Sequence, residues 1–232
     1  MDVEPIAQIA NLIGEGGRIR MLSTLLDGKG HSASELAITA KVSPQAASSH
    51  LSKLLSGGLV TCERQGRQRL FRLKNRDVAV AIEALGALAY SAATPVVPQI
   101  RFARTCYDHL AGVLAIGIRN DLLRKGALRR RKGAFVVTSE GTRFLQALDI
   151  DVDALRRLRR SFAHGCLDWT ERHQHIGGAV GSALLSCFLQ KNWLASVRGT
   201  RAVRVTHAGE RGFENIFGIR CATLRGQAAV RA

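Results

Sequence analysis

The sequence lacks any uncharged apolar run of about 18 residues, the length that a helix needs to cross a bilayer. It also lacks the pattern of a signal peptide. We therefore expect a cytoplasmic protein that does not use a membrane as a partner. Its five cysteines, an odd number, would then lie in a reducing compartment. There, thiols, metal ligands and core residues are more common than disulfide bonds.

Acidic residues are few, with 18 Asp and Glu against 34 Lys and Arg and a net charge of +16. Such a charge attracts nucleic acid, an acidic membrane surface or an acidic partner. Residues 1–94 hold 11 basic and 8 acidic residues, a net +3, whereas residues 95–232 hold 23 and 10, a net +13. Hydrophobic residues make up 46% of the chain, enough for a packed core in one large domain or two small ones.

Motifs of catalysis are also missing. The sequence has no nucleophile elbow, no cofactor-binding loop and no catalytic pair of carboxylates, and the glycine cluster at 14–17 lacks the strand that precedes a phosphate-binding loop. We therefore predict that the protein is not an enzyme. Two alternatives stay open: a thiol-dependent enzyme with Cys106 or Cys166 as its nucleophile, and a protein that coats DNA without sequence preference.

Two short helices separated by a tight turn are predicted over residues 32–56. Ser32 and Glu35 form a capping box for the first helix. Ser43 is an N-cap residue for the second, followed by Pro44 at the first helical position, where proline is favoured. This arrangement is typical of a helix-turn-helix. Two more short amphipathic helices are predicted before it, over residues 5–13 and 18–26.

The second helix of this pair has one apolar stripe and one face of small polar residues. Ala47, Leu51, Leu54 and Leu55 recur at helical spacing and should be buried. The opposite face has short side chains and amide or hydroxyl groups, as a helix that reads base edges in the major groove requires. No acidic residue occurs from 44 to 62. The predicted DNA-binding residues here are Ser43, Gln45, Ala46, Ser48, Ser49, His50 and Lys53.

Residues 59–73 are expected to form a β-hairpin that turns at Gln65–Gly66. Arg64, Arg67 and Arg69 lie near its tip, so it would be a wing that contacts phosphates or a minor groove. A helix predicted over residues 77–93 is apolar nearly all round. Burying it requires a partner copy, which predicts a homodimer with two recognition helices one DNA turn apart.

Residues 6–92 resemble the ArsR/SmtB family of winged-helix repressors. The resemblance is carried by SELAITAKVSPQAASSHLSKLLSGGLVTCERQGRQRLFRL and the apolar last helix. It implies a homodimer that binds a palindromic double-stranded DNA operator and leaves it when an inducer binds. Many members have a Cys-x-Cys metal site where this chain has ELAITA, and others use His and Asp on the last helix, where this chain has Asp77 but no His. Because neither metal site can be transferred, we expect any effector to bind elsewhere.

The second half of the chain is a duplication. After a linker predicted at residues 94–98, RFARTCYDHLAG (101–112) matches SFAHGCLDWT (161–170) followed by HIGG (175–178), with six residues inserted. Each repeat, about 101–144 and 161–213, is expected to have a helix containing cysteine, a longer helix, a hairpin and a glycine-containing turn. The predicted fold class is thus mainly α with small β-hairpins (α+β). A winged helix-turn-helix over 1–94 would precede a C-terminal domain, 99–232, of two tandem winged-helix-like units around a pseudo-two-fold axis.

The repeats concentrate cysteine and histidine. The spacing of Cys106 and His109 would place both on one helix face, and Cys166, His173 and His175 occur at the matching place in the second repeat. Together they could bind zinc, another thiophilic metal or a metalloid, or act as a redox sensor. Packing in the core is the commonest role of such cysteines. The effector of the C-terminal domain could therefore be a metal, an oxidant or a small molecule.

Two basic runs, at 124–132 and 156–160, account for part of the charge of the second half. They could contact DNA phosphates beside the operator, bind an anionic effector, or simply be solvated.

Overall fold

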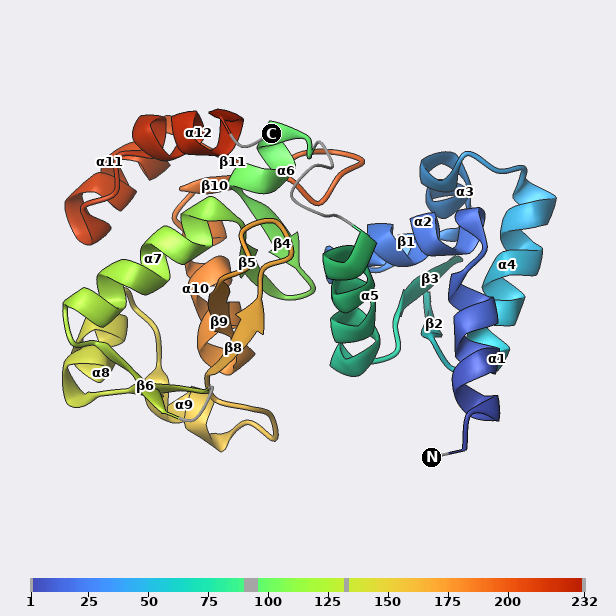
Figure 1. Ribbon diagram of the computed structural model, residues 1–232, viewed down its shortest axis with the longest axis horizontal. Coiled ribbons are helices and arrows are strands. Elements are labelled where there is room, and N and C mark those ends of the chain that lie inside the picture. Colours follow the sequence, from blue (N-terminus) through green and yellow to red (C-terminus); the bar gives the residue numbers. More distant parts are fainter. Residues whose placement is uncertain (1, 90–95, 132–133, 231–232) are drawn as a thin grey trace. The chain divides into compact units, whose positions relative to one another are not determined.

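The computed structural model describes residues 2–89, 96–131 and 134–230, which form two compact units, Met1–Leu85 and Gly86–Ala232. No helix in these described ranges is long and apolar enough to cross a membrane. Residues 94 and 95 of the predicted linker lie outside the described residues, and Pro98 already begins a helix. Each unit is described by itself below (Figure 1).

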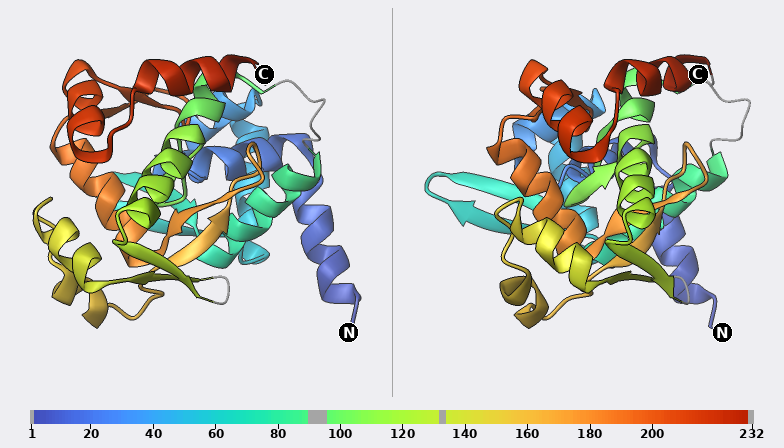
Figure 2. Two further views of the ribbon diagram at one scale, coloured as in Figure 1. Left: turned by 60° about the vertical axis from the view of Figure 1, so that its left-hand side comes forward. Right: turned by 90° about the vertical axis from the view of Figure 1, so that its left-hand side faces the viewer.

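The first unit is a winged helix-turn-helix of four helices, most of a fifth, α5, and a three-stranded sheet of order β1-β3-β2. The β2–β3 hairpin, cyan in Figure 2, extends away from the helices of its unit. In chain order the elements are α1 (Glu4–Ile13), α2 (Gly16–Leu25), β1 (His31–Ser32), α3 (Ala33–Ala40), α4 (Pro44–Ser56), β2 (Val60–Gln65), β3 (Gln68–Leu73) and α5 (Arg76–Ala89).

The helix starts of this unit are those that the sequence predicts. The Ser32 side chain accepts a hydrogen bond from the Glu35 backbone N–H, and the Glu35 carboxylate accepts one from the Ser32 backbone, so the capping box is complete. The Ser43 hydroxyl accepts a hydrogen bond from the Ala46 N–H at 3.1 Å. The core beneath these caps is aliphatic, and its fully buried side chains include Met21, Leu22, Leu25, Leu36 and Leu54. The predicted helix over 77–93 is α5, and residues 90–93 lie outside the described residues.

A half-buried ion pair near β1 makes the first unit sensitive to pH. His31 Nε2 lies 2.9 Å from Asp27 Oδ2, and this hydrogen bond raises the pKa of His31 above its usual 6.5 although burial opposes the shift. A raised folded-state pKa contributes stability that is fully present below the unfolded pKa and is lost as the pH rises through the folded pKa. In an NMR titration, Asp27→Asn should return the pKa of His31 towards 6.5. An unchanged pKa would show that Asp27 is not the cause.

The second unit contains two copies of the same run of elements, hairpin, long helix, hairpin and helix. The first copy is β4 (Arg104–Cys106), β5 (His109–Ala111), α7 (Val113–Arg124), β6 (Leu128–Arg131), β7 (Ala134–Val137) and α8 (Ser139–Gln146). The second is β8 (His164–Leu167), β9 (Gln174–Gly177), α10 (Gly178–Gln190), β10 (Leu194–Ser196), β11 (Val203–Val205) and α11 (His207–Phe217). The remaining helices are α6 (Pro98–Phe102), α9 (Val152–Arg157) and α12 (Cys221–Val230).

The two copies exchange contacts. The second hairpin of copy 1 pairs with the first hairpin of copy 2 at Ala134 and His164. The equivalent residues of the opposite hairpins, Ala202 and Arg104, are also bridged. In the same reciprocal way, α7 packs against β9 and α10 against β5. The copies are therefore related by an internal pseudo-two-fold axis that passes between their first hairpins.

The two copies also share local details. Thr138 and Thr206 are the N-caps of α8 and α11. Each hydroxyl accepts a hydrogen bond from the backbone N–H of the glycine three residues later, Gly141 or Gly209. Gly112 and Gly178 both have positive φ, +94° and +83°, and a Cβ would collide with backbone carbonyl oxygens, those of Arg101 and Phe102 at Gly112 and that of Ser161 at Gly178. Only glycine fits such a close backbone approach without strain.

Two parts of the predicted repeat are wrong. The segments around Cys106 and Cys166 form β-hairpins, so Cys106 and His109 do not share a helix face but are directly opposed residues on β4 and β5. A two-residue turn joins them, in which Tyr107 adopts φ 62°. The expected glycine-containing turns after the second hairpins are the helices α8 and α11. The fold is α+β, and the winged-helix likeness of the repeats stays a prediction.

Candidate DNA interface and thiol–imidazole cluster

The small polar face of α4 is exposed. Ala47, Leu51 and Leu54 are buried beneath the helix, and Leu55 is half-buried. On the outer face Ala46 is half-buried, and the exposed residues are Ser43, Gln45, Ser48, Ser49 and Lys53. The helix thus presents slim side chains and no carboxylate to solvent, starting at its first turn.

His50 differs from the other predicted DNA-binding residues. Its Nε2 lies 3.5 Å from Glu15 Oε2, and its side chain is mostly buried. Glu15 is itself the N-cap of α2, and hydrogen bonds from the backbone N–H groups of Gly17 and Arg18 lower the pKa of its carboxyl group. His50 therefore fixes α4 against the start of α2, which positions the helix.

The wing places its arginines at the tip of a regular hairpin. Strand β2 ends at Gln65 and β3 begins at Gln68, so the loop is Gly66–Arg67, one residue later than predicted. Gly66 adopts a φ of +61°. Arg64 and Arg69 are directly opposed across the hairpin, and Arg64, Arg67 and Arg69 are all exposed. Like charges in directly opposed positions destabilise a hairpin. A bound polyanion would remove this repulsion.

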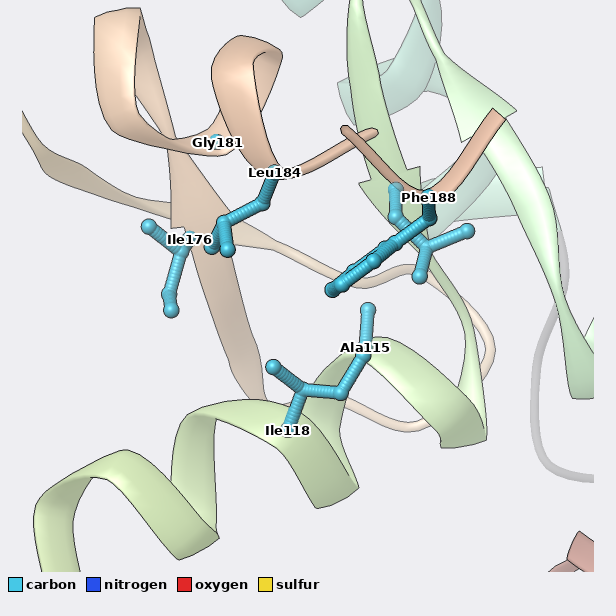
Figure 3. A pocket seen from close by; sticks show the side chains of 7 residues that line it. Ala115, Ile118, Ile176, Gly181, Leu184 and Phe188 are labelled. Carbon is cyan, nitrogen blue, oxygen red and sulfur yellow. The ribbon is translucent and has the colours of Figure 1, made fainter. Parts of the chain in front are cut away.

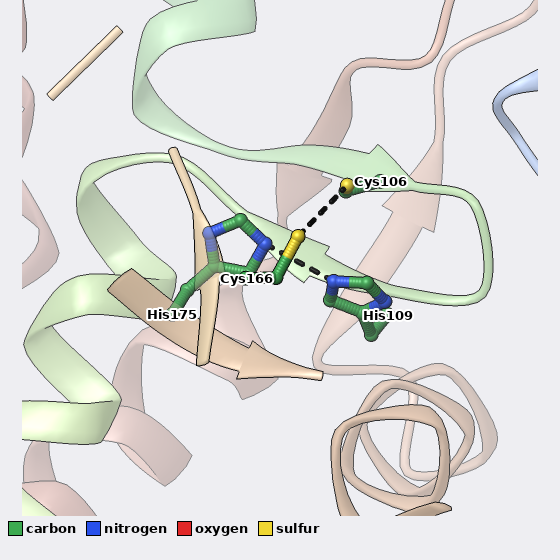
Figure 4. Close-up of side chains that lie close together, drawn as sticks. All are labelled: Cys106, His109, Cys166 and His175. Carbon is green, nitrogen blue, oxygen red and sulfur yellow. Dashed lines mark hydrogen bonds between the residues drawn. The ribbon is translucent and has the colours of Figure 1, made fainter. Parts of the chain in front are cut away.

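The second unit brings four of the five predicted thiol and imidazole residues together. Cys106 is directly opposed to His109 on the β4–β5 hairpin, and Cys166 to His175 on the β8–β9 hairpin. Their Sγ and ring nitrogen atoms all lie within 4.8 Å of one another. The two sulfur atoms are 3.8 Å apart and the Nε2 atoms of the two histidines 3.1 Å apart. Figure 4 shows the four side chains turned towards one another. His173 does not belong to this group: it is exposed, in the inserted loop before β9.

Each histidine of the cluster is backed by an aspartate of its own repeat. His109 Nδ1 lies 3.2 Å from Asp108 Oδ1, and His175 Nδ1 lies 3.6 Å from Asp168 Oδ2. Asp108 and Asp168 occupy equivalent positions, two residues after the cysteine of each repeat. Both imidazoles therefore direct Nδ1 towards a carboxylate and Nε2 towards the centre of the cluster.

Asp168 is the more deeply buried of the two carboxylates. Its oxygens accept hydrogen bonds from Arg104 Nη2 at 3.1 Å, from the Gly112 N–H at 2.6 Å and from the Thr170 hydroxyl at 2.6 Å. Burial acts in the opposite direction, yet the charge of Arg104 and the hydrogen bonds from Thr170 and Gly112 hold the pKa of Asp168 well below its usual value. The equivalent Asp108 has a pKa of about 2, because hydrogen bonds from His109 and Arg160 outweigh its burial.

The two histidines have opposite pKa shifts. Burial disfavours the charged form of His109, but the Cys106 thiolate and the Asp108 carboxylate outweigh it and raise the pKa of His109 to about 9. Burial and the charge on His109 lower the pKa of His175 well below its usual value. A protonated His109 can then donate a hydrogen bond through Nε2 to the neutral His175.

A small cavity lies between α7 and α10, and it is apolar (Figure 3). Its lining residues are Leu110, Ala115, Ile118, Ile176, Gly181, Leu184 and Phe188. Ligand pockets contain a few polar groups that orient the ligand, and this lining supplies no polar side chain. The cavity is a packing gap between the two repeats, whereas the chemically equipped place is the cluster at the first hairpins.

Comparison with known proteins identifies the family. A helix-turn-helix domain family matches residues 15–63, which span α2, α3, α4 and most of β2. The uncharacterized HTH-type transcriptional regulator YdfF of Bacillus subtilis is 41% identical over 221 residues, covering 93% of this chain and 98% of YdfF. The chain belongs to the HTH-type transcriptional regulators. The regulator is therefore a DNA-binding protein and not an enzyme, as the sequence predicts.

Solved structures similar to the regulator each cover less than half of it. A homodimeric winged helix-turn-helix domain from Mycobacterium bovis, described as "a possible ArsR-family transcriptional regulator", is 25% identical, with 38% of this chain and 80% of that chain covered and a TM-score of 0.35. Reduced HlyU from Vibrio cholerae is 26% identical, and the match covers 38% of this chain and 90% of HlyU with a TM-score of 0.34. The similarity to YdfF, in contrast, extends through the second unit.

Proposed function

We propose that the regulator is a homodimeric, sequence-specific repressor that reads a palindromic operator with α4 and is released by an effector bound in its second unit. The observation that carries this proposal is the exposed, acid-free face of α4 followed by a wing with three exposed arginines. Short polar side chains permit close approach to base edges in the major groove. Arginines at a hairpin tip neutralise phosphates and so orient the protein on the duplex.

Exposed apolar side chains on the first unit support a dimer. Ile6 and Ile9 on α1 are 53% and 36% exposed, and Val80 and Leu85 on α5 are 43% and 41% exposed. Burying these side chains against a second copy would be favourable. A two-fold dimer also places one recognition helix in each half-site of a palindrome, about one DNA turn apart.

The base-reading role of α4 is tested by Gln45→Ala with Ser49→Ala. We expect the double variant to lose preference for the operator over random DNA, because the amide and hydroxyl that discriminate bases are gone; one good base contact contributes about 1–3 kcal/mol. Competition gel shifts on the protein's own promoter measure the ratio. Ser56→Ala, at the far end of the same helix, is the matched control. Unchanged operator preference in the double variant would contradict this role of α4.

The wing is tested by replacing Arg64, Arg67 and Arg69 with alanine. Each phosphate contact contributes about 0.9 to the slope of log affinity against log salt. Non-specific and operator DNA should therefore both bind more weakly, with a shallower salt dependence and nearly unchanged sequence preference. Arg172→Ala, an exposed position in the second unit, is the control. If the slope of the triple variant equals that of the wild type, the wing does not contact phosphates.

A further inference from the structure

The thiol–imidazole cluster has the composition of a transition-metal site. Two cysteines and two histidines converge from two hairpins, so the available donors are two sulfur and two nitrogen atoms. A tetrahedral set of this kind is typical of zinc, whereas copper(I) and metalloids are held mainly by sulfur and magnesium or calcium by oxygen. His109, His175 and Cys106 are buried, and Cys166 is the least buried residue of the four.

The separations agree with a tetrahedron. A zinc ion with two sulfurs at about 2.3 Å holds them about 3.8 Å apart, and two nitrogens at about 2.0–2.1 Å lie about 3.4 Å apart. The sulfur atoms of Cys106 and Cys166 are 3.8 Å apart and the histidine Nε2 atoms 3.1 Å. Since the largest separation between donor atoms is 4.8 Å, side-chain movements of about 1 Å close the shell around one ion.

The second layer of residues is also that of a metal site. Metal-bound histidines usually direct their other ring nitrogen to a carboxylate, which fixes the tautomer and the orientation of the ring. Asp108 does this for His109, whereas Asp168 Oδ2 faces His175 Nδ1 at 3.6 Å, just beyond hydrogen-bond distance. Asp168 is in turn held by Arg104 and the Gly112 N–H. Both repeats supply the same Cys, Asp and His, so the same residue types face the cluster from both sides of the pseudo-two-fold axis.

Other roles account for less of this geometry. A disulfide needs the sulfur atoms about 2.05 Å apart. It would not explain why two histidines and their neighbouring aspartates converge on the same place. Core packing explains buried cysteines such as Cys187, whose Sγ donates a hydrogen bond to the Leu148 carbonyl oxygen. It does not explain four donor groups that meet on one axis with one ring nitrogen of each histidine directed inward.

We propose that Cys106, His109, Cys166 and His175 bind one thiophilic divalent cation of the zinc type, which joins the two repeats on their axis. Binding of the ion does not depend on the protein's action on DNA, whereas its role as the effector of the second unit rests on the proposed function. None of the four ligands comes from the first unit.

Metal uptake is measured first on the full-length, fully reduced, chelator-treated wild type. We expect one Zn²⁺ per chain in equilibrium dialysis. With Co²⁺ as a probe, we expect the intense ligand-field bands of a tetrahedral site and a thiolate-to-metal charge-transfer band. Absence of uptake, or the weak spectrum of a six-coordinate ion, would overturn the proposal. So would a Cys106–Cys166 disulfide that forms in place of metal binding.

Paired variants identify the ligands. His175→Gln and Cys166→Ser should weaken Zn²⁺ binding by more than about 100-fold, and Asp108→Asn by about 10–100-fold because it only orients His109. The matched controls are His173→Gln, two residues from a ligand but outside the cluster, and Cys187→Ser, a buried thiol of the same unit. The proposal is wrong if the controls lose the metal as the ligand variants do. If a ligand variant fails to fold, the wild-type Co²⁺ spectrum still decides.

The same wild-type samples are then tested on operator DNA with and without Zn²⁺. Specific DNA binding by a protein that takes up no Zn²⁺ would overturn the metal site and leave the proposed function intact. Uptake of one Zn²⁺ by a protein with no sequence preference would support the metal site and overturn the proposed function. A changed operator affinity on adding Zn²⁺, lost in His175→Gln, would assign the ion as effector.

Discussion

Asp168→Ala should lower the free energy of unfolding of the second unit by about 3–5 kcal/mol, the cost of breaking a buried ion pair by removing one partner. Arg104 and Asp168 are both fully buried, and their charged groups are 3.1 Å apart. Without the carboxylate, the guanidinium of Arg104 remains in the interior, and the N–H of Gly112 loses its acceptor. The variant therefore loses the ion pair with Arg104 and the hydrogen bond that holds the Gly112 backbone at the end of the first hairpin.

Urea denaturation followed by tryptophan fluorescence measures this effect in the full chain, since both tryptophans, Trp169 and Trp193, belong to the second unit. Glu214→Ala is the matched control, because it breaks an exposed pair with Arg220 and should cost less than about 1 kcal/mol. Asp168→Asn keeps the shape of the side chain and separates charge from packing. If Asp168→Ala and Glu214→Ala unfold at the same urea concentration, the buried pair does not stabilise the unit.

The helix-turn-helix could be predicted from local sequence because each of its boundaries depends on neighbouring residues. A capping box is complete within four positions, and Pro44 after Ser43 defines a helix start without reference to the rest of the fold. The exposed face of α4 follows from the spacing of Ala47, Leu51 and Leu54 alone. His50 is the exception, because its contact with Glu15 joins two helices that are far apart in sequence.

The hairpins of the second unit could not be predicted in the same way. Cys106 and His109 are three residues apart, which is the spacing of neighbours on a helix and also of opposed residues around a two-residue turn. What decides between them is Tyr107 at φ 62°, a conformation that is uncommon for a bulky residue and has no sequence signal. The pairing of Arg104 with Ala202 and of Ala134 with His164 depends on the whole unit.

The duplication nevertheless indicated which residues would meet. Equivalent residues of two copies lie on opposite sides of a pseudo-two-fold axis, so a residue near the axis meets its own counterpart. Cys106 meets Cys166 and His109 meets His175 for this reason. His173 has no counterpart in the first copy, since it lies in the six-residue insertion, and it is outside the cluster. Internal alignment was therefore a better guide to the cluster than proximity in sequence.

Zn²⁺ should stabilise the second unit of the wild type by about 4 kcal/mol when the free ion is at about 1,000 times its dissociation constant, because it binds the folded state and not the unfolded one. The four proposed ligands come from two hairpins whose cysteines are 60 residues apart in sequence. Unfolding either repeat separates them, so the ion should stabilise both repeats and not one hairpin. Tryptophan fluorescence in urea, with Zn²⁺ or with a chelator, measures the shift in midpoint.

Two variants make this expectation specific. His175→Gln removes a proposed ligand and should abolish the Zn²⁺-dependent shift, whereas His173→Gln should retain it in full. The NMR signals of His31, which lies in the first unit, should show no Zn²⁺-dependent change in that unit's unfolding midpoint, because none of its residues contributes to the cluster. A midpoint that does not respond to Zn²⁺ in the wild type would mean that the ion does not join the repeats. An equal response in His175→Gln would place the binding site elsewhere.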